Sequence, residues 1–208
     1  MKIFTQKDFD NFSIINGVRL CPTGDYSAIK NFSNNCNFDT KCLFDDDCSF
    51  GNGCKFGEGC RFGNRCSFSS YCSFSNYCSF GTYCDFGDEC RFGWLCRFGW
   101  LCRFGDECRF GDECRFGEFC GFGEACCFEK GRKTNPGHPV LTFDGFGSSN
   151  RTTYFFNCED GIFVRCGCFS GFIDQFREQV KATRNGKIAD EYLTIADLVE
   201  RKWKAEKC

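Results

Sequence analysis

Apolar and polar positions follow an unbroken period of six through the middle of the chain. A cysteine stands at every sixth residue from Cys36 to Cys126, and a phenylalanine stands at every sixth residue from Phe32 to Phe128. The unit reads Cys-x-Phe-Gly-x-x. Residues two apart on an extended strand point to the same side, so Cys and Phe are expected to face inward while the residue between them faces solvent. A period this short does not fit a pair of helices, and it predicts a β-solenoid.

The Gly-x-x half of the unit is expected to form a turn. Glycine adopts positive φ without a steric penalty, so the glycine after each Phe is predicted to be the residue at which the chain bends. The two variable residues continue the turn, and each hexapeptide is one short strand plus one corner. Seventeen repeats run from Lys30 to about Gly131. They predict five to six coils and a rod about 25–28 Å long.

The order of residues in one repeat, Phe92-Gly93-Trp94-Leu95-Cys96-Arg97, resembles the hexapeptide-repeat left-handed β-helix. The pattern of that family has a large apolar residue, then Gly, two variable residues, a small inward residue and one more variable residue. The resemblance implies a triangular, left-handed coil of three hexapeptides, in which residues eighteen apart stack over each other. This chain departs from the family by placing Phe at every large position, where aliphatic residues are usual.

The sequences on either side of the repeat lack its period. Residues 1–29 are predicted to form an N-terminal cap and a first irregular coil, because their apolar residues mix with turn signals such as Asn16-Gly17. Residues 30–131 form the predicted solenoid, and residues 132–138 form a linker of basic and turn-forming residues. Residues 139–208 are expected to form a small α+β module, so the chain is predicted to be mainly β.

The predicted C-terminal module has three strands and two helices. Alternating apolar runs at 140–146, 153–157 and 162–169 are interpreted as the three strands of a meander. Ser170 is expected to cap the first helix. The apolar residues between 188 and 203 lie at helical spacing and predict the second helix.

Two segments of this module, 142–147 and 164–169, resemble small proteins carried by phages and gut bacteria. The resemblance brings no activity with it. It favours a protein that is encoded by a mobile element and acts on a host factor.

Cysteine usage favours a reducing compartment. The chain has 22 cysteines, most of which are part of the repeat as small buried hydrophobes. The first residues, Met1 to Asp8, contain no apolar run of the kind found in signal peptides, and no stretch approaches the length of a membrane span. We expect a cytoplasmic protein whose cysteines are reduced and which has no membrane partner.

Catalytic and metal-binding interpretations find few residues to support them. Hexapeptide-repeat β-helices include acyltransferases with a histidine base and zinc enzymes with several histidines, whereas this chain has one histidine, His138, in the predicted linker. Cys166 and Cys168 would face the same side of a strand, with Cys158 opposite on its hairpin partner, but core packing explains the same cysteines. We expect no enzyme, cofactor or metal site, and an acyltransferase acting through His138 is the least favoured alternative.

The outward positions of the predicted solenoid carry the differences between its coils. With eighteen residues per coil, one corner stacks carboxylates into an acidic edge: Asp88, Glu89, Asp106, Glu107 and Glu124. The neighbouring corners stack an apolar band: Tyr77, Tyr83, Trp94, Leu95, Trp100, Leu101 and Phe119. Arginines flank the band, with Arg91 and Arg109 on one face and Arg97 and Arg115 on the next.

An aromatic band bordered by arginine is typical of protein interfaces, and two Trp-Leu pairs are costly to leave in water. Side chains that only cover the edges of the coil would explain the same stacks. Between residues 36 and 130 there are ten Lys and Arg against fifteen Asp and Glu, a net charge of −5 that disfavours direct binding of nucleic acid. We predict a non-enzymatic solenoid that binds a host protein, such as a nucleic-acid-processing or defence enzyme.

Two other functions stay open. The acidic edge would let the rod act as a DNA mimic that occupies a basic groove of a host enzyme. Alternatively, the apolar band would join copies of the chain into a homo-oligomer, which would make this a self-assembling structural protein.

Overall fold

The computed structural model describes residues 1–117, 119–128, 131–135, 139–146 and 151–205. The chain divides into two compact units, Met1–Gly131 and Arg132–Cys208. The first unit is a solenoid of stacked parallel strands, and the second is a small α+β unit with an antiparallel sheet and two helices. The predicted mainly β class, with a solenoid and an α+β C-terminal region, is confirmed.

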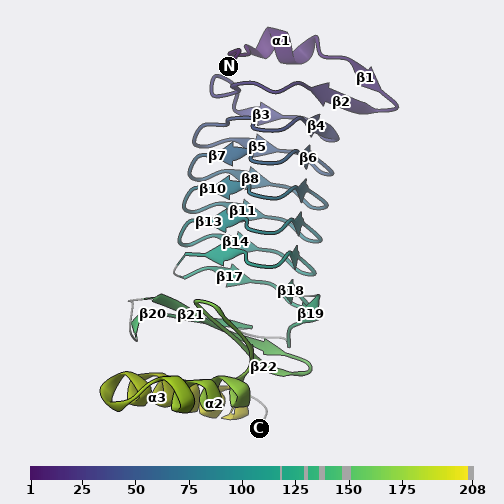
Figure 1. Ribbon diagram of the computed structural model, residues 1–208. Coiled ribbons are helices and arrows are strands. Elements are labelled where there is room, and N and C mark those ends of the chain that lie inside the picture. The colour runs from purple at the N-terminus through teal and green to yellow at the C-terminus, as the bar shows by residue number, and fades with distance from the viewer. Residues whose placement is uncertain (118, 129–130, 136–138, 147–150, 206–208) are drawn as a thin grey trace. The chain divides into compact units, whose positions relative to one another are not determined.

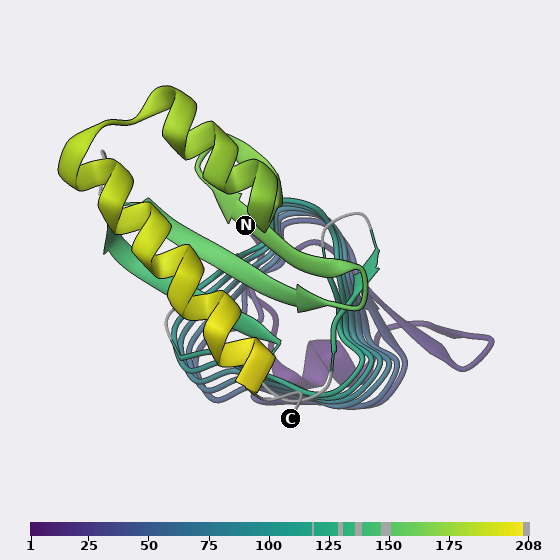
Figure 2. The same ribbon diagram turned by 90° about the horizontal axis from the view of Figure 1, so that it is seen from below.

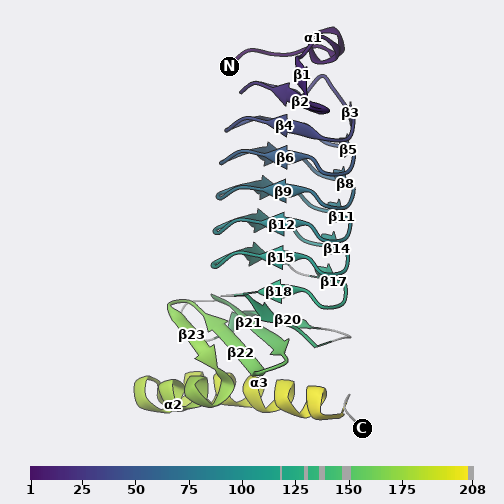
Figure 3. The ribbon, with the colours of Figure 1, turned by 90° about the vertical axis from the view of Figure 1, so that its right-hand side faces the viewer.

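Short parallel strands line three faces of the solenoid (Figures 1 and 3). Face A consists of β7 (Arg61–Phe62), β10 (Ser79–Phe80), β13 (Arg97–Phe98) and β16 (Arg115–Phe116). Face B includes β4 (Cys36–Phe38), β6 (Lys55–Phe56), β9 (Ser73–Phe74), β12 (Arg91–Phe92), β15 (Arg109–Phe110) and β18 (Cys127–Phe128). Face C consists of β3 (Asn31–Phe32), β5 (Ser49–Phe50), β8 (Ser67–Phe68), β11 (Asp85–Phe86), β14 (Arg103–Phe104) and β17 (Gly121–Phe122).

Strands on each face pair in parallel with the strand eighteen residues away, as Phe80 does with Phe98. Three hexapeptides therefore complete one coil. The six strands of face C correspond to about six coils, in agreement with the predicted five to six.

Phenylalanine rings from the three faces fill the interior. The ring of Phe80 stacks on that of Phe98 with centroids 4.9 Å apart and planes 3° apart. It also meets the rings of Phe86 and Phe92 edge-on, at 5.0 Å and 6.0 Å. All three separations lie in the range where aromatic pairs attract. Burial of each ring adds about 2–3 kcal/mol of transfer free energy, so the uniform Phe supplies the core of the solenoid.

The role predicted for the repeat glycine was wrong. Positive φ occurs two residues later, for example at Leu95 (58°) and Leu101 (57°). The glycine is instead required by the close approach of neighbouring coils. A Cβ atom on Gly99 would lie 2.6 Å from the carbonyl oxygen of Gly81 and 2.8 Å from the nitrogen of Thr82. Since the obstructing atoms belong to the backbone, a Cβ atom added at Gly99 would require these two coils to move apart locally. Two repeats hold Ser69 and Ser75 at the equivalent position, so glycine there is preferred and not universal.

The repeat cysteines face inward and hydrogen-bond to the preceding coil. The thiols of Cys84 and Cys102 donate to the carbonyl oxygens of Gly63 and Gly81, at 3.5 Å and 3.4 Å. The neighbouring Cys114 thiol and burial raise the pKa of Cys96 to about 12. The thiol therefore stays protonated at neutral pH and remains a donor. Every described cysteine is a free thiol.

This arrangement predicts a sharp difference in thiol reactivity. Cys168 is exposed, whereas Cys84 and Cys96 are fully buried. At about pH 8.5, near the ordinary pKa of a thiol, iodoacetamide should modify Cys168 within minutes and leave buried repeat cysteines such as Cys84 and Cys96 unmodified until the protein unfolds. Peptide mass spectrometry before and after addition of denaturant measures this. Modification of Cys84 or Cys96 in the folded protein would contradict the burial of the repeat thiols.

The N-terminal residues close one end of the solenoid core. Helix α1 (Gln6–Asp10) begins at Thr5, whose side chain accepts the backbone N–H of Asp8. Phe9 of this helix packs edge-on against Phe32, with centroids 5.3 Å apart. Strands β1 (Ile14–Ile15) and β2 (Val18–Cys21) form a hairpin, and β2 pairs in parallel with β4. Figure 2, viewed along the solenoid, shows this purple hairpin projecting beyond the outline of the coils.

The second unit contains one short strand, a four-stranded antiparallel sheet and two helices. The strands are β19 (Arg132–Lys133), β20 (Val140–Phe146), β21 (Arg151–Cys158), β22 (Gly161–Cys166) and β23 (Phe169–Phe172). The four longer strands pair in sequence order. Helices α2 (Ile173–Thr183) and α3 (Gly186–Ala205) pack through Phe176, Ala196 and Val199 against Phe155 and Val164 of the sheet.

Two details predicted for this unit were wrong. The run 162–169 is not a single strand, because Gly167 adopts a φ of 59° and reverses the chain between β22 and β23. The meander therefore has four strands instead of three. Ser170 does not cap the first helix, because it lies inside β23, and the N-cap is Phe172. The alternation of apolar residues continues through the turn, and this made two strands look like one.

Candidate protein-binding surface

Hydrogen bonds between side chains and backbone hold the corners of the solenoid, and the sequence analysis missed them. The residue after the repeat glycine is often Asn, Asp or Ser, and its side-chain oxygen accepts the backbone N–H of the equivalent residue one coil further on. Oδ1 of Asn64 accepts the N–H of Thr82 at 2.9 Å, and Oδ1 of Asn76 accepts that of Trp94 at 3.1 Å. We call these bonds the corner ladder. Recurrent Asn, Asp and Ser at this position were its signal in the sequence.

Trp94 and Trp100 occupy corner-ladder positions at the two ends of β13. An indole ring offers an N–H donor and no oxygen acceptor, so neither tryptophan can extend the ladder in the way that Asn64 and Asn76 do. The two side chains are 44 % and 51 % exposed. The tryptophans therefore forgo the hydrogen bond that the usual polar residue would accept, and they leave large apolar surfaces facing solvent.

Leu95 and Leu101 follow the tryptophans and adopt positive φ. This conformation costs a residue other than glycine about 1–2 kcal/mol. In earlier coils the same position holds Gly53 and Gly59, for which it is not strained. Tyr77, Glu89 and Glu107 adopt the same conformation, so this cost does not distinguish the leucines from the residues at the same position in other repeats.

The apolar band borders face A on both sides. One ridge, which we call ridge 1, contains Tyr77, Trp94 and Leu95 and precedes the strands of face A. The other, ridge 2, contains Tyr83, Trp100, Leu101 and Phe119 and follows them. Within each ridge the rings contact each other across coils, with centroids 5.2 Å apart for Tyr77 and Trp94 and 6.3 Å apart for Tyr83 and Trp100. Phe119 is 72 % exposed.

Arginines project from the strands between the corners. Arg97 and Arg115 are register partners on β13 and β16 of face A, between the two ridges. Arg91 and Arg109 are register partners on β12 and β15 of face B. Within the described residues these four arginines form no ion pair, whereas Arg65 pairs with Asp47 at 2.7 Å. Because parallel strands lie about 4.8 Å apart, each arginine pair brings like charges close together.

The acidic edge lies at the corner between faces C and B, which does not border face A. Two of its members belong to the corner ladder, since Oδ1 of Asp88 accepts the N–H of Asp106 at 2.9 Å and Oδ1 of Asp106 accepts that of Glu124 at 2.7 Å. Glu107 is exposed on the same corner. A side-chain hydrogen bond with Glu89 raises the pKa of Tyr71. Asp88 and Asp106 thus have a structural explanation that the tryptophans lack.

The other candidate residues do not assemble a site. His138 and Cys208 lie outside the described residues. Cys158 pairs with Gly161 and Cys166 with Thr153, so these cysteines lie at opposite ends of the β21–β22 hairpin and the predicted opposition of Cys158 and Cys166 was wrong. Among the residues placed by the structure, no group of three or more His, Cys, Asp or Glu side chains is arranged to hold a metal ion.

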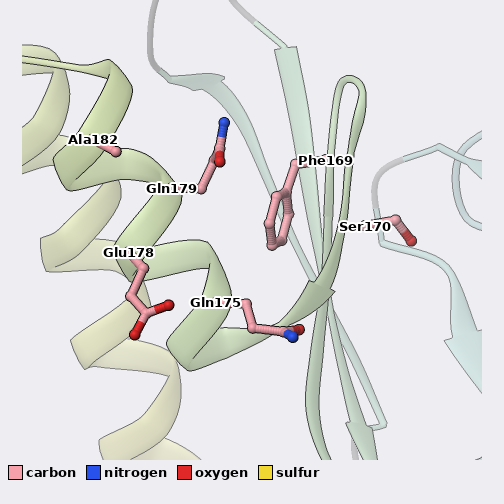
Figure 4. Close-up of a pocket in the computed structure, with 6 residues that line it drawn as sticks. All are labelled: Phe169, Ser170, Gln175, Glu178, Gln179 and Ala182. Atoms are coloured by element: carbon pink, nitrogen blue, oxygen red, sulfur yellow. The ribbon is translucent and has the colours of Figure 1, made fainter.

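A pocket of about 420 Å³ lies beside α2 in the second unit (Figure 4). It is lined by Phe169, Ser170, Gln175, Glu178, Gln179 and Ala182. Oε1 of Gln175 accepts the backbone N–H of Phe172 at 2.9 Å, and Glu178 is the only ionisable residue among the six. Among the described residues, no hydrogen bond joins Ser170 to Glu178, the hydroxyl and the carboxylate of this lining.

Comparisons with known proteins give no match from which a function could be inferred, so the inference must rest on the fold and the exposed side chains. No family model, no curated protein and no solved structure matches the chain. None of the helices in the described ranges has the length and apolar character needed to cross a bilayer. The chain is a β-solenoid protein with two exposed apolar ridges beside a face that carries arginine.

Proposed function

We propose that this protein is a non-enzymatic, protein-binding solenoid and that face A, with ridges 1 and 2, contacts the partner. The observation that supports this is the placement of Trp94 and Trp100 at corners where the fold elsewhere uses an oxygen acceptor. Trp, Tyr and Arg are the residues most enriched at the centres of protein interfaces. Exposed apolar surface of this kind is disfavoured in water unless a partner covers it.

The wider proposal concerns the origin and setting of the protein. The Cys-x-Phe-Gly-x-x unit supports membership of the hexapeptide-repeat left-handed β-helices, and the likeness of the C-terminal segments to small phage and gut-bacterial proteins supports a mobile-element origin. The partner is then a host protein in the cytoplasm, such as a nucleic-acid-processing or defence enzyme. Mimicry of DNA by the acidic edge is a weaker proposal, because Asp88 and Asp106 already accept backbone N–H groups.

Replacement of both tryptophans by asparagine tests the proposal. Asparagine is the residue at the equivalent corners Asn64 and Asn76, so the Trp94→Asn/Trp100→Asn variant should fold and melt at the same temperature as the wild type or higher. Loss of two interface tryptophans should weaken partner binding more than about 100-fold, since each such residue typically contributes 2 kcal/mol or more. Affinity capture from a bacterial lysate under reducing conditions identifies the partner, and interferometry with the purified partner measures the dissociation constant.

Tyr71→Asn is the matched control. Tyr71 is also an exposed corner aromatic, but it lies at the acidic edge and does not border face A. This variant should retain the partner with unchanged affinity. Equal retention by the tryptophan double variant would show that recognition uses the acidic edge or the second unit, and the proposed function of face A would be wrong.

A further inference from the structure

Face A carries positive charge that no described residue neutralises by an ion pair. Its outward side chains, in order along the solenoid, are Arg61, Ser79, Arg97 and Arg115, each in register with the next. Two adjacent strands thus present guanidinium groups side by side, an arrangement that costs free energy in isolation. A binding partner that brings carboxylates would remove this cost.

The neighbouring corners bring no acidic side chain to the coil that contains Arg97. The residues that flank Arg97 in its own coil, Trp94, Leu95, Trp100 and Leu101, are all uncharged, and the acidic edge lies at the corner that face A does not touch. The nearest acids on ridge 1 come one coil later, at Asp112 and Glu113. Although the repeat region has a net charge of −5, the surface centred on Arg97 is therefore positive and apolar, and the overall charge does not describe it.

A two-fold contact of face A with itself does not suit this surface. A two-fold contact between two copies of face A would set the column of Arg61, Arg97 and Arg115 against itself, because that column runs along the middle of the face. Like charges facing each other across a desolvated contact are strongly unfavourable. The arginines thus argue against self-association through the apolar band.

Single-stranded nucleic acid fits less well than a polypeptide. A base inserted between two rings needs about 6.8 Å between them, twice the 3.4 Å rise of stacked bases. The ring centroids of Tyr77 and Trp94 are 5.2 Å apart, and their planes are inclined by 56°. The rings of Tyr77 and Trp94 pack against each other, and ridge 1 continues with Leu95, which offers no stacking surface. Such ridges suit the apolar side chains of a protein.

We propose that the occupant of face A is an acidic polypeptide segment whose carboxylates bind Arg97 and Arg115 and whose apolar side chains lie on ridges 1 and 2. This inference rests on the proposed function and adds the chemistry of the partner. The guanidinium group binds carboxylate through two parallel hydrogen bonds, and such bonds are stronger when apolar groups exclude water around them.

Two matched double variants test the charge. Arg97→Ser/Arg115→Ser removes the arginines of face A, and Arg91→Ser/Arg109→Ser removes the same number from face B. Serine occupies the same outward columns at Ser79 and Ser73, so both variants should fold. The probe is a phage-displayed library of random linear peptides, panned on the wild-type protein. Enriched peptides should combine acidic with apolar residues. Their affinity should fall more than about 10-fold in the face A variant and less than about 3-fold in the face B variant, and it should weaken with added salt.

The other outcomes separate this inference from the proposed function. Enriched peptides without acidic residues, which still require Trp94 and Trp100, would overturn the acidic partner and leave face A as the interface. Failure to enrich any peptide above the Trp94→Asn/Trp100→Asn protein would count against face A as a binding surface. Labelled oligo-dT or single-stranded RNA that binds through Arg97 and Arg115 would assign the face to nucleic acid instead. A dimer in light scattering that Arg97→Ser/Arg115→Ser stabilises would assign it to a second copy.

Discussion

Replacement of Phe98 by alanine is expected to destabilise the solenoid by about 3–5 kcal/mol, the cost of removing a buried aromatic side chain and leaving a cavity. Phe98 is 5 % exposed and stacks between Phe80 and Phe116, at 4.9 Å and 5.2 Å. It also meets Phe92 and Phe104 edge-on at 5.0 Å and 4.9 Å. Rings in register across several coils cannot all move into the gap, so the cavity should persist. Urea unfolding followed by circular dichroism measures the loss.

A solenoid distributes this loss in a particular way. Each coil contacts only its neighbours, so a gap at Phe98 should weaken the coils of β10, β13 and β16 more than those near the N-terminal end of the unit. Hydrogen exchange should therefore report its largest increase in these strands. Phe119→Ala is the control, because this ring is exposed and its removal should change stability by less than about 0.5 kcal/mol. A Phe98→Ala variant that loses less than about 1 kcal/mol would mean that the stacked rings are not the main source of stability.

The solenoid could be predicted because one interval determines it. Cys and Phe two residues apart require a strand, and recurrence after six residues leaves room only for a short turn. The strands, the inward side chains and the number of coils followed from that interval. The role of the glycine did not, because its cause is the distance between Gly99 and the backbone of Gly81, eighteen residues away. Only the coil-to-coil spacing reveals that contact.

The sequence was enough to predict which residues lie on the candidate surface. It was not enough to predict which of them hold the corners of the solenoid together. The stacking of Tyr77, Trp94 and Leu95 followed from eighteen residues per coil. The corner ladder did not, since a hydrogen bond from the backbone N–H of Trp94 to Oδ1 of Asn76 leaves no apolar trace in the sequence. Without the ladder, Asp88 and Trp94 looked like equivalent outward positions. With it, Asp88 is part of the corner structure, and Trp94 is the residue that the fold does not explain.

Replacement of Gly99 by alanine is expected to cost about 3 kcal/mol or more, at or beyond the upper end of the usual range for overpacking. The added Cβ would lie 2.6 Å from the carbonyl oxygen and 2.7 Å from the carbonyl carbon of Gly81. These atoms are held in place, since the N–H of Gly99 bonds to the carbonyl oxygen of Phe80 at 3.0 Å. The coils must separate locally, which would strain this bond. Thermal and urea unfolding of the variant measure the effect.

Gly59→Ala distinguishes the two reasons for which a glycine is used in this repeat. Gly59 has a φ of 70°, and the nearest atom to an added Cβ is Cγ of Lys41 at 3.6 Å, an ordinary contact. Alanine there meets only the cost of a left-handed conformation, about 1–2 kcal/mol, which Tyr77 and Leu95 already bear at the same position in later coils. The loss should therefore be clearly smaller than for Gly99→Ala. If Gly59→Ala were the more damaging change, backbone conformation and not coil-to-coil approach would govern the repeat, and the explanation given for its glycine would fail.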